Sequence, residues 1–296
     1  MILSNLKAIA ASLAVLAGTA FQASVADEPK VTVEYDINYA RPNGTELKLD
    51  IARPGEGDGP FPAVFVIHGG GWSAGDKKDM RPALSDFARR GYVAISPQYR
   101  FSPKDTFPAQ VHDVKAAVRW VKSHAKEYKV DTKHIGAVGF SAGGHLAMML
   151  GLTGPSDGLE GDAVAGEPDT SIQAVVNYFG PTDLAATDYP EVTQPIINRF
   201  LGGTPKEKAK EACQASPLTF VSKGDAPILT FQGTKDPLVP HSQATKLADA
   251  LSNAGVPGRV ELLIGAGHGW GGDDMKRTLA DMFAFFDHYL KPQPQK

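Results

Sequence analysis

The chain has 296 residues, of which 42% are hydrophobic and 21% are charged, and its formal net charge at pH 7 is −3. This length and apolar content allow a large buried core, which excludes an intrinsically disordered protein. The negative charge argues against nucleic acid or an anionic membrane surface as a partner. Cys213 is the only cysteine, so an internal disulfide bond is excluded. We expect it to be a structural thiol at a helix end rather than a nucleophile.

Residues 1–26 have the pattern of a secretory signal peptide. Lys7 is their only charged residue, residues 8–21 are apolar, and Ser24-Val25-Ala26 supplies small residues ahead of Asp27. The apolar stretch is short for a membrane span, and an uncleaved anchor is the alternative. We predict an exported protein, periplasmic or extracellular, with no membrane span after signal cleavage. Removing the positive charge of Lys7 takes the formal charge from −3 to −4.

Residues 27–296 are predicted to form a single α/β domain, because strands and helices alternate along them. Two early strands, at 31–40 and 45–54, flank Asn43-Gly44, a dipeptide typical of a hairpin turn. Strands are then expected at 62–68, 92–99, 134–140, 171–179, 226–233 and 259–265, and helices at 79–91, 108–125, 142–152, about 192–213, 241–254 and 273–290. Apolar strands separated by helices are typical of a mostly parallel sheet covered on both faces. We therefore predict an eight-stranded, mostly parallel sheet with helices on both faces.

The sequence "GFSAG", residues 139–143, joins the strand at 134–140 to the helix at 142–152. G-x-S-x-G at a strand-to-helix turn is the pattern of a nucleophile elbow, in which glycines on both sides allow a sharp turn that presents the serine hydroxyl. Gly144 then allows the helix to approach closely. A tight structural turn is the alternative. The context favours Ser141 as a catalytic nucleophile.

A serine nucleophile needs a histidine base that a carboxylate orients. Of the eight histidines, only His268 lies on a glycine-rich loop after the last predicted strand. In elbow hydrolases the carboxylate lies between the serine and the histidine along the chain. Asp236, just past the strand at 226–233, is therefore the predicted partner of His268. Asp183, which follows the preceding strand, is the rival.

A second glycine cluster, "HGGGW" at residues 68–72, follows the predicted strand at 62–68. Main-chain N–H groups of such a loop, together with the N–H of the residue after the nucleophile, stabilise the oxyanion of acyl transfer. We assign this oxyanion hole to Gly70, Gly71 and Ala142. A phosphate-binding loop is the alternative, but neither glycine cluster completes G-x-G-x-x-G and no Walker lysine follows. His68 has no second ligand at close spacing, so it is not expected to bind a metal.

Several motifs carry a resemblance to a known family: "HGGGW", Tyr99-Arg100, "FPAQVHDVKAAVRWV", "GFSAGGHLA", "GTKDPLVP" and "GAGHGW". Together they resemble the α/β-hydrolase superfamily, and more narrowly esterases similar to hormone-sensitive lipase and the bacterial feruloyl/acetyl esterase-like group. This resemblance implies ester hydrolysis without a cofactor, with Ser141, Asp236 and His268 as the triad. It also implies that Arg100 and Asp113 support the active-site face.

The chain departs from hormone-sensitive-lipase relatives in the segment before the glycine loop, where those proteins usually carry a helical cap. Here that segment is predicted to form a hairpin, and only the insertion at 181–225 remains to cover the site. We therefore predict a secreted serine carboxylesterase for short-chain acyl esters, including acetyl or feruloyl esters of carbohydrates. A serine exopeptidase of the same fold and a non-catalytic binding protein are the alternatives.

Overall fold

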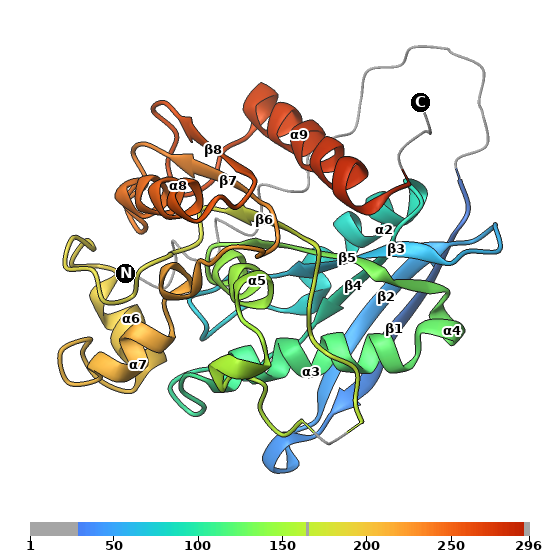
Figure 1. Cartoon of the computed structure of the whole chain (residues 1–296), viewed down its shortest axis with the longest axis horizontal. Coiled ribbons are helices and arrows are strands. Elements are labelled where there is room, and N and C mark those ends of the chain that lie inside the picture. Colours follow the sequence, from blue (N-terminus) through green and yellow to red (C-terminus); the bar gives the residue numbers. More distant parts are fainter. Residues whose placement is uncertain (1–28, 164–165, 293–296) are drawn as a thin grey trace.

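The computed structural model describes residues 29–163 and 166–292, so the predicted signal peptide at 1–26 lies outside the described residues. Eight strands form one sheet in the order β1-β2-β4-β3-β5-β6-β7-β8 (Figure 1). This arrangement confirms the predicted fold class. Among the described residues, none of the helices combines the length and the apolar content that a membrane crossing requires.

The strands are β1 (Val31–Ala40), β2 (Leu47–Pro54), β3 (Phe61–Ile67), β4 (Val93–Pro97), β5 (Val130–Phe140), β6 (Ala174–Tyr178), β7 (Ile228–Gly233) and β8 (Gly258–Leu263). The pairs β1–β2 and β2–β4 are antiparallel, and the pairs from β4 to β8 are parallel. Asn43 and Gly44 both adopt positive φ between β1 and β2, as the hairpin prediction requires. The parallel strands end at one edge of the sheet, so the loops that follow them meet there.

The helices are α2 (Arg81–Arg89), α3 (Ala109–Ser123), α4 (Ala125–Tyr128), α5 (Ala142–Leu152), α6 (Gln194–Leu201), α7 (Ala209–Gln214), α8 (Ser242–Ala254) and α9 (Gly272–Leu290). Buried side chains of α3, α5 and α8 belong to one apolar cluster, and those of α2 and α9 belong to a second. The sheet therefore separates two helical layers (Figure 1).

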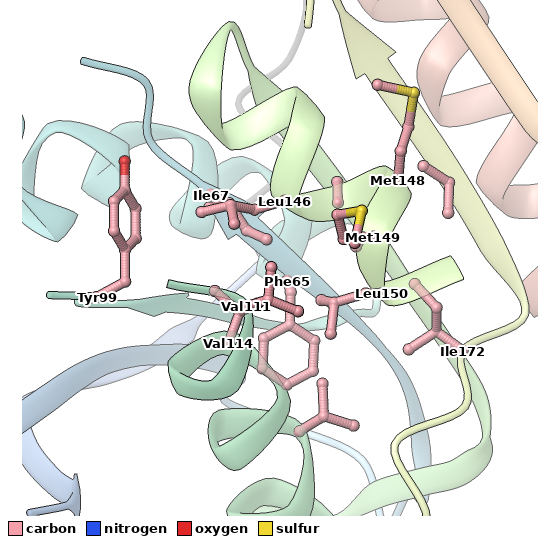
Figure 2. Packing of buried hydrophobic residues seen from close by; sticks show 14 of the residues in the cluster. Phe65, Ile67, Tyr99, Val111, Val114, Leu146, Met148, Met149, Leu150 and Ile172 are labelled. Atoms are coloured by element: carbon pink, nitrogen blue, oxygen red, sulfur yellow. The ribbon is translucent and has the colours of Figure 1, made fainter. Parts of the chain in front are cut away.

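Helix α5 occupies the centre of the layer that it forms with α3 and α8. Figure 2 shows Leu146, Met149 and Leu150 of α5 packed near Phe65 of β3 and Val114 of α3. These five side chains are almost completely buried. Burying one such side chain contributes about 1.5–3 kcal/mol, so α5 and the serine at its start are held firmly.

The predicted helix at 192–213 is wrong, because the chain forms α6 and α7 with a break between them. Gly202 ends α6 in the left-handed conformation with a φ of 80°, and its N–H donates to the carbonyl of Asn198 (2.9 Å). Pro205 follows three residues later. A left-handed glycine followed by proline is a usual way to stop a helix.

Candidate active site

Ser141 lies at the turn between β5 and α5 with a φ of 55° and a ψ of −119°. Its N–H donates to the carbonyl oxygen of Tyr178 at 2.9 Å. A Cβ on Gly139 would lie 2.1 Å from the carbonyl oxygen of Gly143, and a Cβ on Gly143 would lie 2.1 Å from that of Ile67. The local sequence therefore forms the sharp elbow because glycine alone fits at these two contacts.

His268 bridges Ser141 and Asp236. Its Nε2 lies 2.9 Å from Ser141 Oγ, and its Nδ1 lies 2.7 Å from Asp236 Oδ2. The histidine side chain is 6% exposed and the aspartate side chain is 0% exposed. The carboxylate also accepts hydrogen bonds from the N–H groups of Leu238 (2.8 Å) and Val239 (2.9 Å) and from Gln232 Nε2 (3.0 Å). These donors fix the carboxylate facing the imidazole in the arrangement of a serine, a base and an orienting acid.

Asp183, the rival carboxylate, is placed elsewhere. It contacts Lys246 Nζ at 3.2 Å and accepts a hydrogen bond from the N–H of Ala185 at 3.1 Å. Among the hydrogen bonds of the described chain, His268 Nδ1 is joined to Asp236 and not to Asp183. The structure therefore brings together the set Ser141, His268 and Asp236 that the sequence favoured.

The glycine loop after β3 lies beside the elbow. Gly70 and Gly71 have φ values of 119° and 58°. The carbonyl oxygen of Gly70 accepts hydrogen bonds from the N–H groups of Ser73 and Ala74, both at 3.1 Å, which closes the loop into a tight turn. Within residues 29–163 and 166–292, the N–H groups of Gly70, Gly71 and Ala142 have no hydrogen-bond acceptor. Three main-chain donors next to Ser141 are therefore available to an oxyanion.

Trp72 ties this loop to the elbow helix. Its Nε1 donates to His145 Nδ1 at 3.1 Å, and His145 Nε2 donates to the carbonyl oxygen of Ala215 at 2.7 Å. The indole also stacks on Phe200 of α6, with ring centroids 4.1 Å apart. Burial lowers the pKa of His145 to about 4, so its imidazole is neutral and can accept one hydrogen bond while donating the other.

His68 begins the loop and is buried under it. Its Nδ1 lies 2.8 Å from the carbonyl oxygen of Gly69, and its ring stacks on Tyr99 with centroids 4.5 Å apart. Burial lowers the pKa of His68, so the ring stays neutral near the site. Next to Tyr99, Arg100 forms a buried ion pair with Asp113, with Nη2 2.7 Å from Oδ1. The ion pair of Arg100 and Asp113 thus adjoins Tyr99, which packs against His68 at the start of the glycine loop.

A cavity of about 560 Å³ opens beside the serine. Its lining includes Ser141, Ala142, His268, the glycine loop, Phe140, Phe179, Tyr189, Ile196, Leu238, Val239, Trp270, Asp79 and Arg199. This volume suits a small ligand. The insertion at 181–225 supplies one wall through α6, because a Cβ on Gly71 would lie 2.8 Å from Ile196 Cγ2. Within the described part of the chain, no group of three or more His, Cys, Asp or Glu side chains could hold a metal ion.

The model of the BD-FAE family matches residues 49–251. The chain belongs to the BD-FAE family. This membership and the fold confirm the resemblance to the α/β-hydrolase superfamily and to its bacterial feruloyl/acetyl esterase-like group. The family match covers the glycine loop, the elbow and Asp236, and it ends before His268.

Three relatives illustrate what this BD-FAE chain is similar to. The probable carboxylic ester hydrolase LipM of Mycobacterium tuberculosis is 35% identical over 73% of this chain and 51% of its own length. A carbohydrate esterase from gut microbiota, solved in a truncated form, has a TM-score of 0.76 at 30% identity, covering 89% of this chain and 98% of that one. Esterase Est2 of Thermogutta terrifontis has a TM-score of 0.72 at 27% identity, covering 91% of this chain and 96% of that one. The chain spans about half the length of the curated relatives it matches.

Proposed function

We propose that this BD-FAE protein is a serine carboxylic ester hydrolase with Ser141, His268 and Asp236 as its catalytic triad and Gly70, Gly71 and Ala142 as its oxyanion hole. The observation that carries the proposal is the pair of hydrogen bonds at 2.9 Å and 2.7 Å through His268, on the wall of the cavity. A hydroxyl, a base and an acid in this order are the arrangement that activates serine toward an acyl carbon.

In the first half of the reaction, Ser141 Oγ attacks the ester carbonyl carbon and gives its proton to His268 Nε2. The carbonyl oxygen becomes an oxyanion that accepts hydrogen bonds from the main-chain N–H groups. The loss of one such donor typically costs about 3 kcal/mol of transition-state stabilisation. When the tetrahedral intermediate collapses, the bond to the alcohol breaks and His268 returns the proton to the leaving oxygen. Asp236 keeps the Nδ1–H in place and stabilises the imidazolium meanwhile.

In the second half, water takes the place of the alcohol. His268 removes a proton from this water, the hydroxide oxygen attacks the acyl carbon, and Ser141 leaves with the proton restored to Oγ. The products are a carboxylic acid and the free enzyme. No step requires a group from outside the chain other than water.

We further propose short-chain acyl esters as substrates, with acetyl or feruloyl esters of carbohydrates among them. The cavity supports a small acyl group, because α6 closes one wall of it while Asp79 and Arg199 in its lining are exposed. Among the structural neighbours, Est2 was solved with propionate and with butyrate bound, and the gut protein is named a carbohydrate esterase. Export, suggested by residues 1–26, is consistent with a substrate outside the cytoplasm.

The test compares p-nitrophenyl acetate with an aminoacyl p-nitroanilide on the wild-type protein and on Ser141→Ala. We expect turnover of the ester only, and an organophosphate that labels one residue, Ser141, in each chain. Turnover of the anilide in preference to the ester would show an exopeptidase. If neither is hydrolysed although the chain is folded, the binding-protein alternative holds.

A further inference from the structure

The turn after β6 contains an aromatic residue in a strained conformation. Phe179 has a φ of 45°, in the left-handed region that a bulky side chain avoids, and it is only 6% exposed. Such strain persists where the surrounding structure imposes it, and it is concentrated at functional sites. The proposed mechanism gives this residue no task, although it lines the cavity.

Two hydrogen bonds hold the peptide group that joins Tyr178 to Phe179. The carbonyl oxygen of Tyr178 accepts the N–H of Ser141 at 2.9 Å, and the N–H of Phe179 donates to the carbonyl oxygen of Phe231 in β7 at 2.8 Å. On the other side, a Cβ on Gly180 would lie 2.6 Å from the main-chain nitrogen of His145 in α5. The turn is therefore confined between the nucleophile elbow and β7, which accounts for the strain.

The Phe179 side chain contacts the base itself. Its ring centroid lies 4.6 Å from that of His268, with an angle of 57° between the planes. Trp270 packs edge-on against the same phenyl ring at 5.4 Å. Hydrogen bonds at Nδ1 and Nε2 fix the imidazole along the line through its nitrogens, but they leave it free to rock about that line. A rigid ring packed beside the imidazole opposes this motion.

We propose that Phe179 is a positioning residue that couples the nucleophile to the base. Its turn holds Ser141 through the carbonyl group of Tyr178, and its ring holds the imidazole of His268. One residue thus controls both ends of the 2.9 Å contact between Ser141 Oγ and His268 Nε2. This inference rests on the proposed function, because it assigns a role within that triad. A small displacement of a reacting group is known to lower rates by as much as about a hundredfold.

The first experiment compares Phe179→Leu with Phe179→Tyr, using p-nitrophenyl acetate so that cavity size matters little. Phe285→Leu on α9, outside the cavity lining, makes the same chemical change away from the site. For Phe179→Leu we expect kcat to fall by about tenfold to a hundredfold while KM changes by less than about threefold. Phe179→Tyr keeps a planar ring and is expected to restore kcat. A wild-type kcat in Phe179→Leu would overturn the proposal.

A second readout does not depend on turnover. The proton between His268 Nδ1 and Asp236 can be followed by NMR, and we expect it to exchange with solvent faster in Phe179→Leu than in the wild-type protein or Phe179→Tyr. Equal exchange rates in all three would overturn the inference. This comparison stays valid if the wild-type protein hydrolyses no ester, an outcome that would refute the proposed function alone.

A third comparison separates positioning from folding. Glycine adopts a φ of 45° without the cost that alanine has there, so Phe179→Gly should unfold at a higher denaturant concentration than Phe179→Ala. If Phe179 positions His268, both variants have the same low kcat in spite of this difference. If kcat instead follows stability and recovers in Phe179→Gly, the role of Phe179 is structural and the proposal fails.

Discussion

The glycine loop after β3 and the elbow after β5 are both rich in glycine, but for different physical reasons. In the loop, Gly70, Gly71 and Gly75 have φ values of 119°, 58° and 105°. In the elbow, a Cβ on Gly139, Gly143 or Gly144 would lie 2.1, 2.1 or 2.2 Å from an oxygen atom, although none of the three has a positive φ. A Cβ on Gly70 or Gly75 would also lie 2.1 Å from the carbonyl oxygen of Ala74 or 2.4 Å from His68 Nδ1. The loop therefore needs glycine for its conformation as well as for close packing, whereas the elbow needs it for close packing alone.

This difference matches the tasks proposed for the two junctions. The loop presents N–H groups, so the direction of its backbone matters most, and unusual φ values set that direction. The elbow presents a side chain, so α5 must lie directly against β3 and β6, and the single positive φ is at Ser141 itself. Substitutions at the two junctions should consequently fail in different ways.

The largest expected effect comes from removing the chemistry of the elbow while leaving its packing intact. Ser141→Ala should lower kcat by about 10⁵-fold or more, because the residual rate comes from binding and the oxyanion hole. His268→Ala should cost nearly as much, and Asp236→Asn about 10⁴-fold. Steady-state kinetics with circular dichroism as a folding control checks these values. Asp183→Asn is the matched control, and a greater loss there than in Asp236→Asn would show that the carboxylate was wrongly assigned.

The next largest effect concerns stability, and it tests directly whether the glycine loop and the elbow need glycine for different reasons. In Gly143→Ala the new Cβ meets main-chain oxygens of Ile67 and His68, so unfolding free energy should fall by about 3 kcal/mol or more. In Gly71→Ala the new Cβ meets the Cγ2 methyl group of Ile196 at 2.8 Å, a side-chain rather than a main-chain contact, and the left-handed φ costs alanine about 1–2 kcal/mol.

Gly71→Ala should therefore fold but lose about tenfold to a hundredfold in kcat, as its N–H shifts from the oxyanion position. Urea unfolding measures the stability of Gly143→Ala and Gly71→Ala, and steady-state kinetics measures their kcat. The distinction between conformation and packing breaks down if Gly71→Ala is the less stable variant.

The elbow and the glycine loop could be predicted from sequence because each pattern is contained in a few consecutive residues. Chain order and a strand end narrowed the carboxylate to Asp236 or Asp183, and the hydrogen bond from His268 Nδ1 to Asp236 separates the two. The break between α6 and α7 also had a local signal, since Gly202-Gly203 and Pro205 interrupt the helical pattern, and the prediction of one helix overlooked it.

Contacts between distant segments could not be predicted in this way. Trp72 and His145 are 73 residues apart, and nothing in either neighbourhood indicates that they share a hydrogen bond. The strain at Phe179 arises from hydrogen bonds and packing that involve β7 and α5, so the local sequence gives no sign of it beyond the glycine that follows. Tertiary contacts decide these features, and local propensity does not.

A smaller effect should appear where the loop and the elbow are joined, at His145. Its pKa of about 4 in the folded chain lies below the value of about 6.5 for a free imidazole. Between these pH values the unfolded chain binds a proton that the folded chain does not, so stability falls as the pH drops from about 6.5 to about 4. The loss attributable to His145 should reach about 3 kcal/mol.

Urea unfolding at pH 7 and at pH 4.5 measures this loss. His145→Gln removes the titrating group and keeps a side chain that can both accept and donate a hydrogen bond. The wild-type protein should therefore lose more stability between the two pH values than the variant does. Parallel losses would show that other groups cause the acid sensitivity of the junction.

The smallest effect concerns acyl-chain length, and it depends on the contact between the glycine loop and the insertion at 181–225. Each methylene that leaves water gains about 0.8 kcal/mol, but only where protein covers it. Ile196 closes the cavity against Gly71, whereas the exposed Asp79 and Arg199 offer a long chain no apolar cover. Acetyl to butyryl p-nitrophenyl esters should thus have a kcat/KM at least about tenfold above twelve-carbon esters, or about 1.4 kcal/mol. A maximum at eight or more carbons would show that the insertion forms a deeper acyl pocket.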